Sequence, residues 1–224
     1  MDASARPLVG RREFLAGAAA MGRAAKYRVG VIGHTGRGNY GHGLDVVWRE
    51  FPETEVVAVA DADEKGLAAA VKRLGGVRGF ADYRRMLDEA RPDVVAVSPR
   101  WLDQHCDMVV AAAERGAKGI YLEKPLCRTL EEADRMEAAC SKSGTKVAIA
   151  FQTRYSQKLP VLRKLIAEGR LGRVLEFRAR DKEDRRGGGE GLVVLGPHMF
   201  NLISVLGGAP EWCYARVKIG RAHV

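Results

Sequence analysis

The chain has 224 residues, of which 46% are hydrophobic and 29% charged, a length that suffices for one large domain or for one domain and part of another. No stretch approaches the ~18 consecutive apolar residues that a helix needs to cross a bilayer, so the sequence predicts no membrane span. The net charge of +9 comes from 37 Lys and Arg against 28 Asp and Glu. Because the basic residues are interspersed with acidic ones instead of being clustered, we expect no nucleic-acid partner.

The N-terminal residues 1–26 are set apart from the fold. Arg11 and Arg12 lie just before Phe14 and Leu15, which resembles a twin-arginine export signal. The apolar stretch that follows, Leu15–Gly22, is short for a signal peptide, and no small-residue cleavage site follows it. Two interpretations stay open: an export signal of a periplasmic protein, or a flexible extension of a cytoplasmic one.

From Tyr27 to residue 152, short apolar runs alternate with amphipathic segments. The runs predict buried strands at Arg28–Gly33, Glu55–Ala60, Asp93–Val97, Gly119–Leu122 and Lys146–Phe151. Helical patterns lie between them. One begins in Leu44–Phe51, and another starts at the capping box Thr129–Glu132 and ends near Ser143. Apolar strands separated by helices of this length are typical of a doubly wound α/β domain with a parallel sheet.

The pattern changes near residues 150–155, where we place a domain boundary. Residues 153–218 predict helices at Leu159–Gly172 and Pro197–Leu206, and two strands at Val174–Arg180 and Glu211–Lys218. The polar and apolar residues of Val174–Arg180 alternate, which suggests a sheet with one exposed or ligand-facing side. This segment is expected to begin an α+β open-faced sheet domain.

A glycine-rich turn follows the first strand and offers two registers of the G-x-G-x-x-G motif. Gly36, Gly38 and Gly41 match its letters but begin three residues after the strand. Gly33, Thr35 and Gly38 are correctly placed at the strand end, with Gly36 beside the gap, and we prefer this register. Such a turn lets backbone N–H groups and a helix N-terminus approach a pyrophosphate.

Asp61 ends the second strand, where dinucleotide-binding folds place an acid against the adenosine ribose. A carboxylate there accepts hydrogen bonds from the 2′-hydroxyl and repels a 2′-phosphate, which favours NAD over NADP. Asp61 could instead cap the next helix, but Asp63 is better placed for that role. Strand, glycine turn, helix and Asp61 together predict a dinucleotide site.

Several segments, in order from about Arg28 to Lys218, resemble the Gfo/Idh/MocA family of NAD(P)-dependent oxidoreductases. They are GVIGHTGRG, VVAVADAD, EKPLCRTLEEAD, FQTRYS, LIAEGRLGRV and LGPHMFNLISVLGG, and Glu123-Lys124-Pro125 is the most specific piece. The resemblance implies a Rossmann domain followed by an open-faced domain whose sheet supports homo-oligomers. It also implies an enzyme that acts on CH–OH groups of a sugar, a cyclitol or a related polyol.

The resemblance assigns roles to individual residues. Lys124 would lie near the nicotinamide and the substrate hydroxyl, and His198 would transfer the proton. The other residues implied at the cofactor or the substrate are Pro99, Glu123, Arg154, Tyr155 and Asn201. Imidazole titrates in the range that alcohol oxidation requires, and a lysine can stabilise a developing alkoxide. A lone histidine at the start of an apolar helix is also often only structural.

One departure from the family pattern concerns the acids around His198. The family commonly has an acid four residues before this histidine and another three residues after it, where this chain has Val194 and Asn201. Asn201 can hold an imidazole by a hydrogen bond but cannot neutralise imidazolium. A second hypothesis is therefore an NAD-binding protein that has impaired activity or uses transient oxidation for elimination or hydrolysis. Glu190 is a conceivable substitute for the missing acid.

The four cysteines, Cys106, Cys127, Cys140 and Cys213, lack metal-like spacing, so we expect free, buried thiols and no metal site. At the other end of the chain, only two strands are predicted in the second domain, too few for a stable sheet. Residues 219–224, Ile-Gly-Arg-Ala-His-Val, match one reading frame of a common sequencing-library adapter. We therefore expect an incomplete second domain and a non-native tail; the alternative is a genuine short C-terminus, which would leave an open sheet edge.

Overall fold

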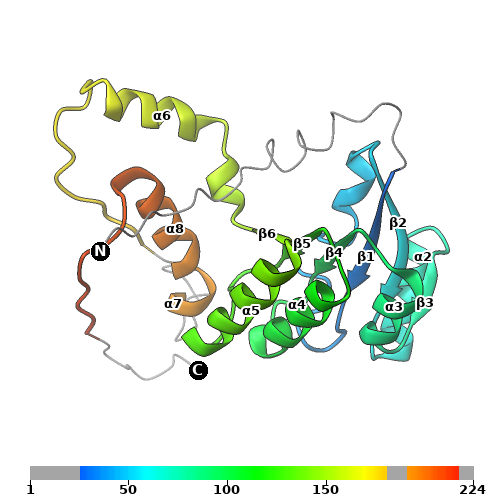
Figure 1. Ribbon diagram of the computed structural model, residues 1–224. Helices are drawn as coiled ribbons and strands as arrows, with labels where there is room; N and C mark the ends of the chain where they lie inside the picture. Colours follow the sequence, from blue (N-terminus) through cyan, green and yellow to red (C-terminus); the bar gives the residue numbers. More distant parts are fainter. Residues whose placement is uncertain (1–25, 181–190, 217–224) are drawn as a thin grey trace, which may run out of the picture. The chain divides into compact units, whose positions relative to one another are not determined.

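The computed structural model describes residues 26–180 and 191–216, which form two compact units, one ending at Ala150 and the other beginning at Phe151 (Figure 1). The twin-arginine segment, Glu190 and the tail at residues 219–224 lie outside the described residues. No helix in the described part of the chain is long and apolar enough to cross a membrane.

The first unit is built on a six-stranded sheet in the order β3-β2-β1-β4-β5-β6, in which every pair of neighbours is parallel. The strands are β1 (Tyr27–Ile32), β2 (Thr54–Ala60), β3 (Arg78–Phe80), β4 (Val94–Val97), β5 (Gly119–Leu122) and β6 (Lys146–Ile149). This order confirms the doubly wound Rossmann fold. The sequence did not indicate β3, because Arg-Gly-Phe is too short and too polar to resemble a buried strand.

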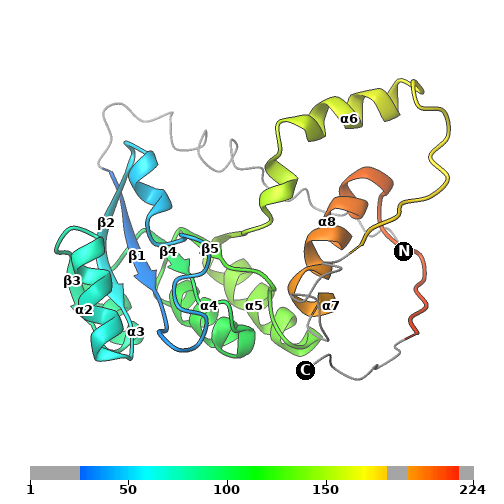
Figure 2. The same ribbon diagram turned by 180° about the vertical axis from the view of Figure 1, so that it is seen from behind.

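Helices cover both faces of this sheet (Figures 1 and 2). They are α2 (Glu64–Arg73), α3 (Tyr83–Ala90), α4 (His105–Glu114) and α5 (Leu130–Ser143), with short 3₁₀ helices η1 (Val47–Glu50) and η2 (Leu102–Gln104). One core joins α3, α4 and α5 to side chains such as Val95 and Ile120. The other joins η1 and α2 to side chains such as Val31 and Val94. The alternation of side chains along each strand supplies both cores.

Two helix starts follow the capping chemistry that the sequence indicates. Thr129 precedes α5 and accepts a hydrogen bond from the Glu132 backbone N–H at 3.2 Å. Asp63 precedes α2 and accepts one from the Gly66 N–H at 2.6 Å. Both predictions are confirmed, and the cap at Asp63 leaves Asp61 for another role.

The segment Leu44–Phe51, in which a helical pattern begins, forms only the short 3₁₀ helix η1 (Val47–Glu50) and no α-helix. Between residues 34 and 46 the chain forms consecutive turns, and only the four-residue η1 follows. Five residues in this stretch have positive φ: Gly36, Gly38, Asn39, Gly41 and Gly43. An α-helix requires negative φ at every residue, so these left-handed residues prevent an α-helix from starting before Leu44.

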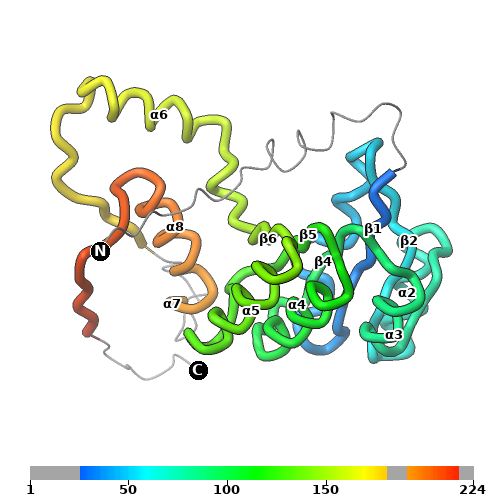
Figure 3. The backbone as a smooth tube through the Cα atoms, in the orientation of Figure 1, coloured from blue at the N-terminus to red at the C-terminus, as the bar shows by residue number. Residues whose placement is uncertain are grey.

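The second unit is helical in its described part: η3 (Gln152–Tyr155), α6 (Lys158–Ala167), α7 (Gly191–Val194) and α8 (Gly196–Gly207) (Figure 3). The strands expected at Val174–Arg180 and Glu211–Lys218 do not form, since residues 174–180 and 211–216 have no regular secondary structure. Residues 217 and 218 lie outside the described part. An extended segment becomes a strand only when a neighbour pairs with its N–H and C=O groups, and alternation alone supplies no neighbour.

All four cysteines are free. Cys106 and Cys140 are buried, and burial raises the pKa of both thiols. Cys127 is half-buried and Cys213 is exposed, so the expectation of buried thiols was wrong for Cys213. The residues that the structure describes contain no group of three or more potential metal ligands.

Two leucines provide a direct test of the core on α3, α4 and α5. Leu87 is 2% exposed and Leu130 is 80% exposed. We expect Leu87→Ala to lower the free energy of unfolding by about 2–5 kcal/mol, because it leaves a cavity. The matched control Leu130→Ala is expected to change it by no more than about 0.5 kcal/mol. Urea unfolding followed by circular dichroism measures both, and equal effects would contradict this assignment of the core.

Candidate functional site

The candidate site lies at the carboxyl ends of the strands, where the sheet changes direction between β1 and β4. From β1 the chain continues to β2 on one side, and from β4 it continues to β5 on the other. The loops after β1 and β4 therefore diverge, and a crevice outside the strand ends is the usual place for a ligand in such sheets. Side chains from the loops after β1, β2, β4 and β5 converge here.

The carboxylate of Asp61 is the most heavily hydrogen-bonded group at this edge. Asp61 is 2% exposed. It accepts hydrogen bonds from the Thr35 N–H (3.0 and 3.1 Å), the Thr35 hydroxyl (2.7 Å), the Tyr40 hydroxyl (2.8 Å) and the Asp63 N–H (3.0 Å). The end of β2 thus holds the beginning and the middle of the glycine turn.

Tyr40 packs against the first glycine of the turn. A Cβ added at Gly33 would lie 2.1 Å from the Tyr40 ring, so only glycine fits there. The pKa of the Tyr40 hydroxyl is raised, first by burial and then by its hydrogen bond to Asp61. Tyr40 therefore remains a neutral donor to the carboxylate, while the Arg73 guanidinium lies over its ring at 4.7 Å.

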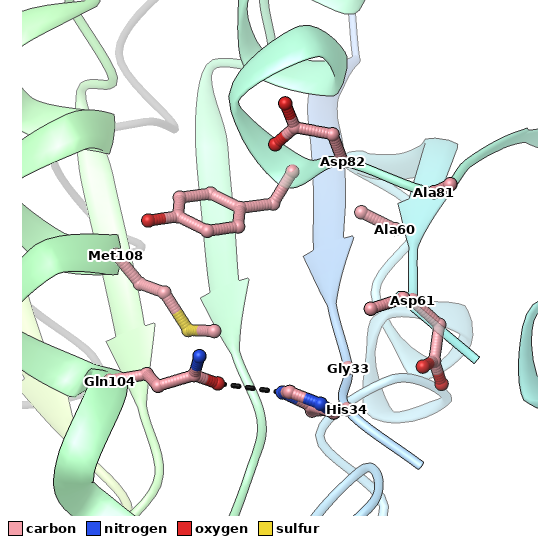
Figure 4. A pocket seen from close by; sticks show the side chains of 10 residues that line it. Gly33, His34, Ala60, Asp61, Ala81, Asp82, Gln104 and Met108 are labelled. Carbon is pink, nitrogen blue, oxygen red and sulfur yellow. Dashed lines mark hydrogen bonds between the residues drawn. The ribbon is translucent and has the colours of Figure 1, made fainter.

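A cavity of about 200 Å³ opens beside this network (Figure 4). Its lining comes from the ends of β1, β2 and β3 and from η2 and α4: Gly33, His34, Ala60, Asp61, Ala62, Ala81, Asp82, Tyr83, Gln104 and Met108. The His34 Nδ1–H donates to Gln104 Oε1 at 2.6 Å, and this bond crosses one end of the cavity, with Asp82 at the other end. Pockets for drug-sized ligands are about 300–1,000 Å³, so this cavity suits one part of a dinucleotide, such as a base.

The glycine turn also contacts the loop after β4. Arg37 pairs with Asp103 and lies 5.2 Å from the centroid of the exposed Trp101 ring. Arg100 Nε donates to the Gly38 carbonyl at 3.4 Å. A Cβ at Gly38 would lie 2.3 Å from the Arg100 backbone nitrogen, so glycine allows the two loops to touch.

Glu123 and Lys124 follow β5 at the same edge and are 1% and 6% exposed. The Glu123 carboxylate accepts a hydrogen bond from His42 Nδ1–H at 2.8 Å, and His42 belongs to the end of the glycine turn. Glu123 N–H also donates to the Val97 carbonyl at 2.9 Å, at the end of β4. Lys124 is followed by a cis peptide bond to Pro125. Lys124, which the sequence analysis predicts to be catalytic, therefore lies at the carboxyl end of β5.

His105 joins the loop after β4 to the loop after β5. Its ring is fully buried, with Nε2 2.7 Å from the Pro99 carbonyl and Nδ1 2.9 Å from the Pro125 carbonyl. Pro99 therefore contributes its carbonyl to this link. The loops that carry Pro99 and Lys124 are fixed relative to each other by one side chain from the start of α4.

The structure brings the predicted cofactor residues of the first unit to one edge of the sheet: Gly33, Thr35, Gly36, Gly38, Asp61, Pro99, Glu123 and Lys124. Arg154, Tyr155, His198 and Asn201 belong to the second unit. Their roles in binding and catalysis stay predictions. The prediction that Asp61 binds the adenosine ribose also stays open. Its carboxylate already accepts hydrogen bonds from four donor groups of the protein.

Within the second unit, His198 lies in the first turn of α8, and its ring meets the Phe151 ring edge-on with centroids 5.9 Å apart. Val194 ends α7 and is 40% exposed, so an apolar side chain occupies the position of the family's acid. The Oδ1 atom of Asn201 is buried and has no hydrogen-bond partner among the described residues. Arg154 and Tyr155 end η3.

Sequence reasoning missed several residues of this edge: His34, Arg37, Tyr40, His42, Arg100, Gln104 and His105. Their partners are far away in the chain; His42 and Glu123, for example, are separated by 81 positions. No local spacing marks such a pair. The only available signal was the position of His34, Arg37 and His42 within the glycine-rich segment itself.

The residues present fit a dinucleotide. A cavity opens beside Asp61 at the strand ends, and a Cβ at Gly36 would meet no protein atom within 4 Å, so the turn leaves room there for a ligand. The Ser98 hydroxyl, directly after β4, is buried and has no hydrogen-bond partner among the described residues.

The family profile described as "Oxidoreductase family, NAD-binding Rossmann fold" (GFO_IDH_MocA) matches residues 27–151. The chain belongs to the Gfo/Idh/MocA oxidoreductase family. This match confirms the resemblance that the glycine turn and Glu123-Lys124-Pro125 carry, and it covers the whole sheet of the first unit.

Curated relatives include dehydrogenases of sugars and cyclitols. Levoglucosan dehydrogenase of Pseudarthrobacter phenanthrenivorans is 35% identical over 127 residues, which are 56% of this chain and 32% of the relative. Myo-inositol 2-dehydrogenase of Thermotoga maritima is 26% identical over 156 residues, 69% of this chain and 45% of the relative. The chain therefore spans less than half the length of these relatives.

Solved structures show the same fold. Myo-inositol 2-dehydrogenase from Lactobacillus plantarum superposes with a TM-score of 0.70 at 22% identity, over 82% of this chain and 57% of that one. The WlbA dehydrogenase from Bordetella pertussis, in complex with NADH and UDP-GlcNAcA, superposes with a TM-score of 0.67 at 24% identity. The superposition covers 82% of this chain and 56% of that one.

Two aspartates test the role of the Asp61 network. We expect Asp61→Asn to lower the free energy of unfolding by about 1–3 kcal/mol, because an amide cannot accept all the hydrogen bonds that the buried carboxylate accepts. The control Asp63→Asn makes the same change two positions away, where asparagine caps a helix as well as aspartate does, so little change is expected. Urea unfolding measures both variants; a larger effect at Asp63 would contradict the role of Asp61.

Proposed function

We propose that this chain is part of an NAD-dependent oxidoreductase that acts by hydride transfer at a hydroxyl-bearing carbon of a sugar, a cyclitol or a related polyol. The observation that carries this proposal is the position of Lys124. It is buried at the carboxyl end of β5, and its neighbour Glu123 is hydrogen-bonded to the glycine turn. Lys124 and the residues proposed to bind a dinucleotide thus share one edge of the sheet.

NAD is the proposed cofactor, in preference to NADP. The Asp61 carboxylate follows β2 beside the cavity that suits a base, and its negative charge disfavours a 2′-phosphate nearby. The nicotinamide supplies the hydride chemistry when it is bound. The protein's own residues bind and orient it and handle the proton.

Lys124 and His198 are the proposed catalytic residues. The ammonium of Lys124 would lower the pKa of the substrate alcohol or stabilise its alkoxide, and the His198 imidazole would take or return the hydroxyl proton. Tyr155, Arg154 and Asn201 are proposed to orient substrate or cofactor from the second unit. The names of the curated relatives, levoglucosan dehydrogenase and myo-inositol 2-dehydrogenase, support a polyhydroxylated substrate. A homo-oligomer is proposed for the whole protein.

Val194 favours a second candidate function. An apolar side chain at this position cannot neutralise imidazolium, so Val194 cannot give His198 the carboxylate support that ordinary dehydrogenation commonly uses. The alternative is an NAD-binding protein of the same fold with impaired redox activity, or one that oxidises its substrate only transiently during elimination or hydrolysis.

Lys124→Ala separates catalysis from cofactor binding. We expect wild-type chain to bind NADH and to reduce NAD with at least one member of a panel of myo-inositol, scyllo-inositol, levoglucosan and glucose. In Lys124→Ala, turnover is expected to fall by at least about 100-fold because the alkoxide loses its stabilising charge, with the Kd for NADH changed by less than about 3-fold. Absorbance at the NADH band and calorimetric titration measure the two quantities.

The matched control is Lys142→Ala, in the last turn of α5, which should change neither quantity. Retained turnover in Lys124→Ala would overturn the catalytic role of this lysine. Conversion of a substrate by elimination or hydrolysis, with no net change in NADH absorbance, would favour the alternative function instead.

A further inference from the structure

The glycine turn lacks the group that usually receives a pyrophosphate in this fold. In most such sites a helix begins directly after the turn, and its N-terminus offers free N–H groups and a partial charge of about +0.5. Here turns fill residues 34–46, and the four-residue η1 begins only at Val47. A ligand with two negative charges therefore meets no helix N-terminus beside Gly36 and Gly38.

Three consecutive N–H groups at the start of the turn already have partners within the protein. The Thr35 N–H donates to Asp61, the Gly36 N–H to Asn39 Oδ1 at 3.0 Å, and the Arg37 N–H to the His34 carbonyl at 3.0 Å. These are the groups that the sequence register places against a pyrophosphate. Because these N–H groups donate hydrogen bonds within the protein, side chains have to bind the anion in their place.

Two acidic side chains at the same edge of the sheet increase the need for positively charged side chains near a bound anion. The carboxylates of Asp61 and Glu123 are almost fully buried on either side of the turn. Fixed negative charge beside an anion site raises the cost of binding a further anion unless cations lie closer to it.

Two guanidinium groups flank the crevice between the loops after β1 and β4. Arg37, in the glycine turn, is paired with Asp103, which offsets most of its charge. Arg100, in the loop after β4, is exposed and forms no ion pair among the described residues; its Nε donates to the Gly38 carbonyl at 3.4 Å. The Arg100 guanidinium thus places a positive charge in the crevice between these two loops, beside the glycine turn, and only its Nε–H is used in the bond to Gly38.

We propose that Arg100, assisted by Arg37, binds the pyrophosphate of the dinucleotide and supplies the positive charge that a helix N-terminus supplies in other sites of this kind. A guanidinium suits this task because its planar set of donors matches two phosphate oxygens at once. The inference rests on the proposed dinucleotide binding and adds to it the residues that hold the phosphates.

The test measures the Kd for NADH by calorimetric titration at sodium chloride concentrations from about 0.05 to about 0.5 M, a range over which screening changes strongly. Arg100→Gln is expected to weaken binding by about 10-fold or more at low salt and to reduce its dependence on salt. Arg100→Lys, which keeps the charge but not the planar set of donors, should keep the salt dependence with a smaller loss of affinity.

Lys142→Gln is the control, because it removes one positive charge from the last turn of α5, at the opposite edge of the sheet. It should leave both the affinity and its salt dependence unchanged. Thermal melting of each variant without ligand shows whether the fold is intact.

The outcomes separate the two levels of the proposal. Wild-type chain that binds no NADH overturns the proposed function and this inference with it. Wild-type binding with unchanged affinity in Arg100→Gln overturns the inference alone. A loss of affinity in Arg100→Gln with an unchanged salt dependence also overturns it, since that result assigns Arg100 a structural role in the loop. Weaker binding with a shallower salt dependence in Arg100→Gln supports it.

Discussion

A carboxylate removed from water must be compensated by hydrogen-bond donors, and at the ligand edge of this sheet that requirement falls on Asp61. Its oxygens accept hydrogen bonds from Thr35, Tyr40 and Asp63, two of which come from the segment after β1. The network can form only if that segment folds back over the end of β2. The shape of the glycine turn is therefore a consequence of burying this one charge.

That shape determines how the site can treat an anion. Left-handed residues at Gly36, Gly38 and Asn39 keep the turn compact and exclude an α-helix. The N–H groups at the start of the turn are then used inside the protein, so positive charge for a ligand has to come from side chains. Arg37 and Arg100 lie on the two loops that border the crevice, where the sheet topology alone would place a dinucleotide.

The parallel sheet could be predicted from the sequence because its strands are short apolar runs. Their residues face two cores, as Val94 and Val95 do. It also identified the caps Asp63 and Thr129, since capping depends on residues three positions apart. It could not reveal contacts such as His42 with Glu123, whose geometry depends on the folded sheet. The prediction of a strand at Val174–Arg180 failed for a related reason. Strand pairing requires a neighbouring strand, which the alternation of polar and apolar residues does not supply.

Three loops at this edge are held together by side chains that act as links between them. His42 joins the turn after β1 to Glu123 after β5, His105 joins Pro99 to Pro125, and Arg100 meets the Gly38 carbonyl. The loop that carries Lys124 is consequently fixed by the same contacts that fix the glycine turn. Because these links lie within the first unit, an apolar Val194 in the second unit leaves them intact. The position of Lys124 therefore depends on contacts of the first unit.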